Sequence, residues 1–414
     1  MKHEDAARFK GNIGKLYAIT FCNGWIFAYV IERLFAVERG LSIIEMQWIF
    51  IIFSVTSVLL EIPCGLLADK WKKKYVLSLG LAICTLEFAM SLMAYSFPVF
   101  ALTYVVTAVG CSLKSGTMES IWYETLQGMG RSDKYEAYLG RWKLLKFALS
   151  GAAGVLGGYM ADRYGLAFNY WMSMFGLPAA AIIALTLYEP ERSIQDGGKI
   201  TSGAECSSRQ NVQQLWKQCR YVLAGPLRPL LPVMLFGGII GAVLYGQLHE
   251  ISSLSFPQLG FQVSQFGYIS LATMIVCALS GLAAAKLKER YSYPAIFVGL
   301  MASSIALLFL YSGAAHKWQI AYLIVCIFLM ETVSPLTTGY IQRRADDRYR
   351  VTISSIDSVV THALTAATGL LFGWSADRFG LFAGFGSMAW LLLASGSVLA
   401  LHYLVQAMRE ASSR

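Results

Sequence analysis

The chain has 414 residues, of which 56% are hydrophobic and only 14% are Asp, Glu, Lys or Arg. A soluble domain carries about 25% charged residues, so the composition excludes a water-soluble globular protein. The formal net charge of +9 is compatible with a nucleic acid or an anionic membrane surface. Basic residues cluster in alternate loops rather than on one face, so we expect no nucleic-acid partner.

Apolar runs of the length that a helix needs to cross a bilayer, about 20 residues, recur along the chain. The first half contains six predicted spans, at 15–37, 46–68, 75–97, 99–126, 139–161 and 166–188. The second half contains six more, at 229–254, 266–285, 293–312, 318–341, 351–375 and 381–407. The sequence therefore predicts an all-α membrane protein with twelve transmembrane helices, divided into a bundle over 1–188, a polar cytoplasmic linker over 189–228 and a second bundle over 229–414.

The loop charges predict the orientation of the chain. Alternate loops carry clusters of basic residues, among them Lys72, Lys73, Lys74, Arg131, Lys134, Lys286, Lys288, Arg290, Arg343, Arg344 and Arg348. By the positive-inside rule these loops are cytoplasmic. We expect a multi-pass protein of the cytoplasmic (inner or plasma) membrane with both termini in the cytoplasm. The polar stretch 1–14 lacks the features of a secretory signal, so we expect the first span to be retained.

An internal repeat supports the division into two halves. Ala-Asp-Arg-Tyr-Gly-Leu at 161–166 returns as Ala-Asp-Arg-Phe-Gly-Leu at 376–381, an offset of 377 − 162 = 215 residues. Both copies lie between the fifth and sixth span of a half. Parallel repeats of six helices place a substrate site near the membrane midplane, in a central cavity between pseudo-symmetric halves.

The stretch Gly65–Lys74, between the second and third spans, resembles the loop signature of the major facilitator superfamily. Lys72 stands where that signature usually has Gly. A degenerate copy at 281–290 lies 281 − 65 = 216 residues further along and lacks the acid. With the twelve spans and the central loop, the resemblance covers almost the whole chain.

The resemblance implies an inner gate at this loop. By position, Asp69 would lie near the start of span eleven, and Lys73 would pair with Glu124 at the inner end of span four; Gly65 and Lys70 complete the motif. Alternatively, the basic residues only anchor the loop at the cytoplasmic face. Drug and proton antiporters of this family carry two further signatures. Neither is intact here, because Val106 occupies the usual Arg position and span five lacks the Pro, which weakens an efflux assignment.

Ionisable residues inside a membrane cost at least a few kcal/mol, so they usually pair or line a wet cavity. At about 1.5 Å of rise per helical residue, Glu87 in span three and Lys114 in span four lie at similar heights above the cytoplasmic ends of their helices. They either form a structural ion pair, or Lys114 binds the substrate. By the same estimate Glu119 and Lys146 form a structural pair. The remaining acids at mid-membrane depth are Glu61, Asp357 and Glu331.

The family places spans two and eleven together, so Glu61 and Asp357 would face one interface, where they either share a proton or find separate donors. Glu331 in span ten, beside Thr332 and Ser334, is the first choice for a substrate or proton site. The alternative is a buried, hydrogen-bonded carboxylate.

Nearer the outside, Glu32-Arg33 in span one and His249-Glu250 in span seven occupy equivalent positions of the two halves. Their offset, 249 − 32 = 217 residues, is close to that of the internal repeat. Arg33 with Glu250 is a candidate outer gate, and His249 is a group that titrates between about pH 5 and 8. The alternative is that these side chains snorkel singly. Among the aromatic residues, Tyr29, Trp122 and Tyr245 are candidates for lining the cavity, packing or facing lipid.

The sequence predicts a secondary active transporter that moves a small organic solute by alternating access, driven by protons. Export is favoured over uptake by symport, and a sensor or scaffold that does not transport is the rival of a different class. A phosphate-binding loop, a zinc HExxH site and a nucleophile elbow are missing from the sequence, so we expect neither a pump nor an enzyme. The eight cysteines form no metal or disulfide pattern, and we expect reduced thiols, no cofactor, no metal and a monomer.

Overall fold

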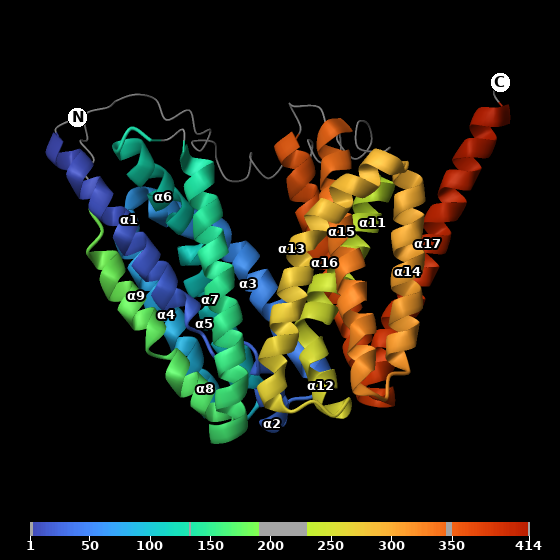
Figure 1. The fold of residues 1–414 in the computed structure, drawn as a ribbon, viewed down its shortest axis with the longest axis horizontal. Coiled ribbons are helices and arrows are strands. Elements are labelled where there is room, and N and C mark those ends of the chain that lie inside the picture. Colours follow the sequence, from blue (N-terminus) through green and yellow to red (C-terminus); the bar gives the residue numbers. More distant parts are fainter. Residues whose placement is uncertain (1–2, 132–133, 190–229, 345–349, 413–414) are drawn as a thin grey trace. The chain divides into compact units, whose positions relative to one another are not determined.

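The computed structural model describes residues 3–131, 134–189, 230–344 and 350–412. Every regular element in these ranges is a helix. The predicted linker lies almost entirely outside the described residues. Two compact units emerge, one formed by Met1–Pro190 with Ile251–Ile275 and the other by Glu191–Glu250 with Val276–Arg414 (Figure 1).

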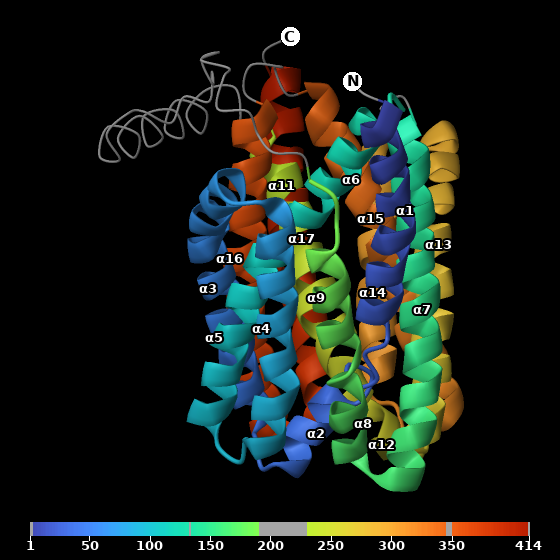
Figure 2. The same ribbon diagram turned by 90° about the vertical axis from the view of Figure 1, so that its left-hand side faces the viewer.

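The described part of the first unit begins, in chain order, with α1 (His3–Gly24), α2 (Glu32–Glu38), α3 (Ile43–Lys70), α4 (Lys73–Met93), α5 (Phe97–Lys114), α6 (Thr117–Gly128), α7 (Tyr135–Tyr164), α8 (Leu166–Ser173) and α9 (Gly176–Leu185). It also contains α12 (Ser255–Gln258) and the start of α13 (Phe266–Arg290). Figure 2 shows this unit from the side on which α9 packs between α1 and α4.

The second unit contains α11 (Leu231–Val243), which continues directly into a π-helical segment, Leu244–His249. The remainder of α13 follows, and then α14 (Tyr293–Ser312), α15 (Ile320–Arg344), α16 (Arg350–Phe379) and α17 (Leu381–Ser412). In this unit α16 packs against both α11 and α17, and α14 packs against both α15 and α17.

Each of the twelve predicted spans coincides with helical structure. Among the described residues, nine helices are long and apolar enough to cross a membrane, and an apolar stretch over Leu381–Ser397 is shorter. The start of α3 illustrates a local cause: Ser42 and Glu45 form a reciprocal capping box that satisfies free backbone donors. The multi-pass prediction is therefore confirmed.

Several predicted spans are interrupted, which the sequence analysis did not anticipate. Span one breaks after Gly24 and resumes as α2. Side chains of α8 satisfy the opened backbone: the Asn169 amide donates to the carbonyl of Phe27 at 3.0 Å, and the Ser173 hydroxyl accepts the backbone N–H groups of Phe27 and Ala28 at 3.0 and 3.1 Å. Irregular backbone at membrane depth requires such internal partners.

Two further breaks lie in spans four and seven. Lys114 is the last residue of α5, and α6 resumes after Gly116, whose φ of +68° is a left-handed conformation that favours glycine. In span seven the interruption is the π-helical segment Leu244–His249. Such segments are rare and are frequent at functional sites.

Small residues allow close helix packing inside the first unit. In α7, which contains predicted span five, an added Cβ on Gly158 would lie 2.9 Å from the carbonyl oxygen of Val263. An added Cβ on Gly267 would meet Val155 Cα at 2.3 Å. This close approach explains why Ile251–Ile275, which the sequence analysis assigned to the half over 229–414, packs with the first unit instead.

The two copies of the internal repeat adopt the same turn. Gly165 ends α7 with φ +85°, and Gly380 ends α16 with φ +95°. The N–H of each glycine donates to the carbonyl of the alanine four residues earlier, Ala161 or Ala376, at 2.9 Å in both cases. The two copies of the repeat are therefore similar in sequence because both end a helix in the same way.

Candidate functional site

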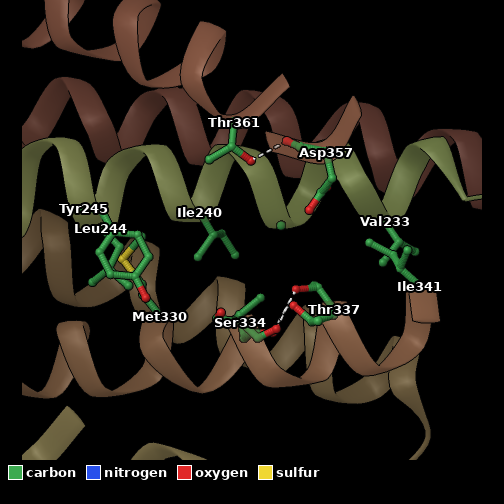
Figure 3. Close-up of a pocket in the computed structure, with 14 residues that line it drawn as sticks. Val233, Ile240, Leu244, Tyr245, Met330, Ser334, Thr337, Ile341, Asp357 and Thr361 are labelled. Carbon is green, nitrogen blue, oxygen red and sulfur yellow. Dashed lines mark hydrogen bonds between the residues drawn. The ribbon is translucent and has the colours of Figure 1, made fainter. Parts of the chain in front are cut away.

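A cavity of about 120 Å³ lies within the second unit, between α11, the π-helical segment, α15 and α16. Its wall is largely apolar, and its polar lining residues are Tyr245, Ser334, Thr337, Thr338, Asp357 and Thr361. Figure 3 shows Tyr245 at one end and Asp357 further along, across from Thr337. An apolar wall with a few convergent polar groups is typical of small-molecule sites.

Glu331 of α15 lies beside the Tyr245 end of this cavity. The Tyr245 hydroxyl donates to its carboxylate, at 3.0 Å from Oε1 and 2.9 Å from Oε2. Tyr245 also stacks on His249 one turn further along the π-helical segment, with ring centroids 5.6 Å apart and planes 14° apart. The phenol thus fixes the position of the Glu331 carboxylate.

His249 and Cys277 complete the surroundings of Glu331. One ligating atom from each of these three side chains lies within 4.8 Å of the other two. From the sequence, His249 was predicted to belong to an outer gate and Glu331 to a separate mid-membrane site. The structure brings the two side chains together, because the helices of spans seven and ten pack against each other.

Asp357 of α16 is half-buried and lines the cavity. Its backbone carbonyl accepts a hydrogen bond from the Thr361 hydroxyl at 2.9 Å, the usual pattern for a threonine inside a helix. No described residue donates a hydrogen bond to its carboxylate. The pairing predicted for Asp357 with Glu61 of α3 joins the two units and stays a prediction; Glu61 is exposed within the first unit.

In the first unit, the predicted contact between Lys73 and Glu124 is present. The Lys73 ammonium lies 2.5 Å from the Glu124 carboxylate and also donates to the Ser120 hydroxyl. The Lys73 side chain is 9% exposed and that of Glu124 is 40% exposed. Gly65 lies in α3, and the side chains of Asp69 and Lys70 lie outside the described residues. The gating role of these residues stays a prediction.

Glu189, which the sequence analysis missed, belongs to the same network. Its carboxylate accepts the backbone N–H groups of Lys73 and Lys74, at 3.0 and 3.2 Å, at the start of α4. The positive end of the helix dipole favours an anion at this place. The Lys74 ammonium donates to the Leu187 carbonyl at 3.3 Å. An acid directly after the sixth apolar run is the signal that could have identified it.

A second polar cluster lies at the break in span four. Glu87 of α4 is buried and interacts electrostatically with Lys114. Lys114 also interacts electrostatically with Cys84, whose sulfur lies 4.0 Å from that of Cys111. The structure thus places Glu87 and Lys114 on facing helices, as their estimated heights predicted. Glu119 and Lys146 are both exposed, and their pairing stays a prediction.

The predicted outer-gate residues of span one form contacts within the first unit. Arg33 is buried and lies 3.6 Å from the Glu32 carboxylate, and the Tyr104 hydroxyl of α5 donates to Glu32. The pairing of Arg33 with Glu250 joins the two units and stays a prediction. Of the aromatic candidates, Tyr245 lines the cavity, whereas Trp122 is fully buried packing and Tyr29 is half-exposed.

The geometry can bind a solute that carries hydrogen-bond donors. The fixed Glu331 carboxylate accepts such donors, the hydroxyls of Ser334 and Thr337 provide further polar contacts, and Asp357 offers a second carboxylate. These groups lie on α15 and α16 and on the π-helical segment, so a relative movement of these helices would change the site. Site residues on several helices allow binding to be coupled to a change of conformation.

Comparison with known proteins supports the motif-based prediction. The family model of the Major Facilitator Superfamily matches residues 16–363. The chain is 22% identical over 363 residues to the uncharacterized MFS-type transporter YxaM of Bacillus subtilis (strain 168), covering 87% of this chain and 88% of that one. It is 21% identical over 392 residues to the MFS-type transporter MJ1560 of Methanocaldococcus jannaschii, covering 93% and 92% of the two chains.

Solved structures share the fold. The nucleoside transporter NupG superimposes with a TM-score of 0.71 at 13% identity, covering 95% of this chain and 99% of that one. A D-xylose-proton symporter superimposes with a TM-score of 0.62 at 12% identity, covering 95% of this chain and 97% of that one. A peptide transporter, POT, solved in complex with sulfate, superimposes with a TM-score of 0.68 at 14% identity, covering 96% of this chain and 94% of that one. Because the family model matches most of the chain, this protein belongs to the major facilitator superfamily.

Proposed function

We propose that this protein is a proton-coupled secondary transporter that moves a small organic solute across the cytoplasmic membrane by alternating access, in the direction of export. The observation that carries the proposal is the Glu331 carboxylate, held by the Tyr245 hydroxyl beside a hydroxyl-lined cavity. Ionisable groups are expensive inside a membrane and usually mark a substrate or ion pathway. The solute class that fits is an organic molecule with amine or hydroxyl donors.

Asp357 is the residue to which we assign proton coupling. It lines the same cavity, and no described side chain supplies a positive partner for its carboxylate. Among the described residues, the other titratable groups at or beside the cavity are Tyr245 and, beyond it, Glu331 with His249 and Cys277. A carboxylate without a counter-charge at membrane depth can be neutralised by a proton, which removes the desolvation cost of its charge. Proton binding would then favour one access state over the other.

The names of the structural neighbours support this class of function. These neighbours include a nucleoside transporter, a peptide transporter and a D-xylose-proton symporter. These solutes are small, organic and rich in hydrogen-bonding groups, like the class proposed from the cavity. At 12–14% identity the likeness supports the fold and the class of process, while the solute itself is inferred from the lining residues.

The inner gate is the second element of the proposal. The network of Lys73, Ser120, Glu124 and Glu189 ties the start of α4 to α6 and to the end of the sixth span. Together with Asp69 at the end of α3, these groups would form contacts that differ between the two access states. Ionic contacts near a loop can be broken and remade at moderate cost, which suits a gate.

Transport into proteoliposomes tests the proposal after a thermal-shift screen of amines, sugars and nucleosides has identified a solute that stabilises the protein. An imposed pH gradient should accelerate flux. Glu331→Gln should weaken solute binding about 10- to 100-fold, because a charged hydrogen-bond acceptor is lost. Asp357→Asn should keep solute binding and lose the acceleration by the gradient.

Glu289→Gln, which alters an exposed acid at the end of α13, is the matched control and should behave as wild type. Export and uptake are separated by comparing the two directions of the gradient in vesicles of known orientation. Undiminished binding in Glu331→Gln, or unchanged proton dependence in Asp357→Asn, would remove the assigned role. A protein that binds solute and shows no flux under any gradient would instead be the sensor or scaffold.

A further inference from the structure

We propose that His249, Cys277 and Glu331 form a binding site for a divalent transition-metal cation of the Zn²⁺ class. The three side chains come from three separate elements, the π-helical segment, α13 and α15. One ligating atom of each lies within 4.8 Å of the other two. The site shares Glu331 with the proposed transport site, but metal binding to it does not depend on transport.

The donor set selects the metal. An imidazole nitrogen, a thiolate sulfur and a carboxylate oxygen are the three ligand types that proteins use for Zn²⁺. The thiolate disfavours hard cations such as Mg²⁺ and Ca²⁺, which prefer oxygen ligands. Polar side chains of a membrane protein generally face away from lipid, which alone could explain why these three lie inside the unit. Avoiding lipid does not, however, require one nitrogen, one sulfur and one oxygen atom to lie close together.

The geometry requires only a small adjustment. With metal–ligand bonds of about 2.0–2.3 Å, donor atoms around a tetrahedral centre lie about 3.3–3.8 Å apart. The observed limit of 4.8 Å is therefore about 1 Å wider, a difference that side-chain rotation can close. Three protein ligands leave the fourth position for water, the arrangement of an open rather than a structural zinc site.

Two supporting contacts hold the ligands. The Tyr245 hydroxyl donates to Glu331, and its ring stacks on the His249 imidazole. Hydrogen bonds that orient the metal-ligating side chains commonly raise metal affinity by about 10- to 100-fold. The π-helical backbone matters too, since it sets how Tyr245 and His249 project from the same segment.

A bound cation would compete with the solute for Glu331, so Zn²⁺ would act as an inhibitor of a transporter whose solute needs that carboxylate.

Cobalt titration of the purified full chain in detergent, with thiols kept reduced, tests the inference. One Co²⁺ per chain should produce the near-ultraviolet absorption of a thiolate-to-cobalt charge transfer, and added Zn²⁺ should abolish it by displacement. Cys277→Ser should lose this absorption, and His249→Gln should weaken binding by more than about 100-fold, since losing a direct ligand exceeds the loss of an orienting contact. His249→Gln also serves as the second variant if Cys277→Ser does not fold.

Cys326→Ser is the matched control, because Cys326 is a buried thiol of the same unit whose sulfur contacts Met330 and the Ser304 carbonyl. It should keep the absorption. A wild-type chain without the absorption, or a signal that survives Cys277→Ser and disappears in Cys326→Ser, overturns the site. Since binding is measured without a gradient, transport without cobalt binding refutes only the metal site, and cobalt binding without transport refutes only the proposed function.

Discussion

At the scale of single residues, this protein stabilises intramembrane acids with neutral donors as well as with cations. Glu331 is held by Tyr245 and Glu32 by Tyr104. A phenol or hydroxyl satisfies a carboxylate without cancelling its charge. The negative charge therefore remains available to a proton, a cation or a solute donor, which a tight ion pair would prevent.

The contact between Lys73 and Glu124 gives a prediction at this scale. Lys73→Ala should lower the free energy of unfolding by about 1–2 kcal/mol, because Glu124 and Ser120 lose a buried ammonium partner. Thermal unfolding in detergent measures the loss. Lys72→Ala, at the exposed neighbouring position, is the control and should leave the melting temperature unchanged. The exchange Lys73→Glu with Glu124→Lys should recover part of the stability, and no recovery would argue against a direct pair.

At the scale of helices, the interface of α4 with α5 depends on two glycines that face each other. An added Cβ on Gly110 would lie 2.7 Å from the Cys84 sulfur and 2.9 Å from the Cys84 backbone nitrogen. An added Cβ on Gly80 would meet the Gly110 carbonyl oxygen at 2.9 Å. Backbone atoms cannot move aside as a side chain can, so the two helices would have to separate.

Gly110→Ala should therefore destabilise the protein by about 1–3 kcal/mol, the usual cost of overpacking. The expected readout is a lower melting temperature in detergent together with increased reactivity of Cys84 and Cys111, which the interface shields. Gly140→Ala in α7 is the matched control, because nothing lies within 4 Å of its added Cβ. That variant should be neutral or more stable by up to about 1 kcal/mol, since alanine is the better helix former. Equal behaviour of both variants would contradict the packing argument.

The repeated turn provides a second test of helix ends. Gly165→Ala and Gly380→Ala should each destabilise by about 1–2 kcal/mol, because both positions have positive φ and alanine pays for a left-handed conformation. Gly299→Ala, in α14 with ordinary φ and open space around its added Cβ, is the control. Similar losses at both turns would support their equivalence, whereas a neutral change at either one would show that its turn relaxes freely.

The internal repeat also relates the two polar clusters. Tyr29 and Tyr245 are 245 − 29 = 216 residues apart, and Lys114 and Glu331 are 331 − 114 = 217 apart. Tyr29 interacts electrostatically with Glu87 and Cys111 in one unit, and Tyr245 with Glu331 in the other. The equivalent position of span four carries a cation where span ten carries an anion. Each half therefore has a polar cluster at an equivalent place in the repeat, with Lys114 in one where the other has Glu331.

At the scale of the whole molecule, the loop charges predict one topology. Green fluorescent protein fused after residue 189 or at the C-terminus should fluoresce, because it folds on the cytoplasmic side. Alkaline phosphatase fused after Gly40 should be active, because it requires the outside. The basis is the excess of Lys and Arg in alternate loops. Phosphatase activity at residue 189 would contradict both the predicted orientation and the cytoplasmic position of the inner gate.

The sequence by itself determined the class of protein, the family and the places of the spans. These follow from local properties: apolar length, alternating loop charge and a loop motif whose residues lie close together in the chain. The Lys73–Glu124 contact was also predicted, because the family motif specifies both positions. The turn at Gly165 and Gly380 was detectable as a repeat because a left-handed helix end depends on a few neighbouring residues.

Only the tertiary structure decided which polar residues meet. His249, Cys277 and Glu331 are separated by 277 − 249 = 28 and 331 − 277 = 54 residues, and their convergence depends on helix rotation and on the π-helical segment. Heights estimated from a regular helical rise cannot include such a segment, or the break after Lys114. Glu189 was missed because its partners are backbone N–H groups, which no pairing of side chains in the sequence indicates, so that only its place directly after the sixth apolar run could have identified it. Side-chain direction around a helix is set by packing against its neighbours, and an apolar sequence specifies that packing only weakly.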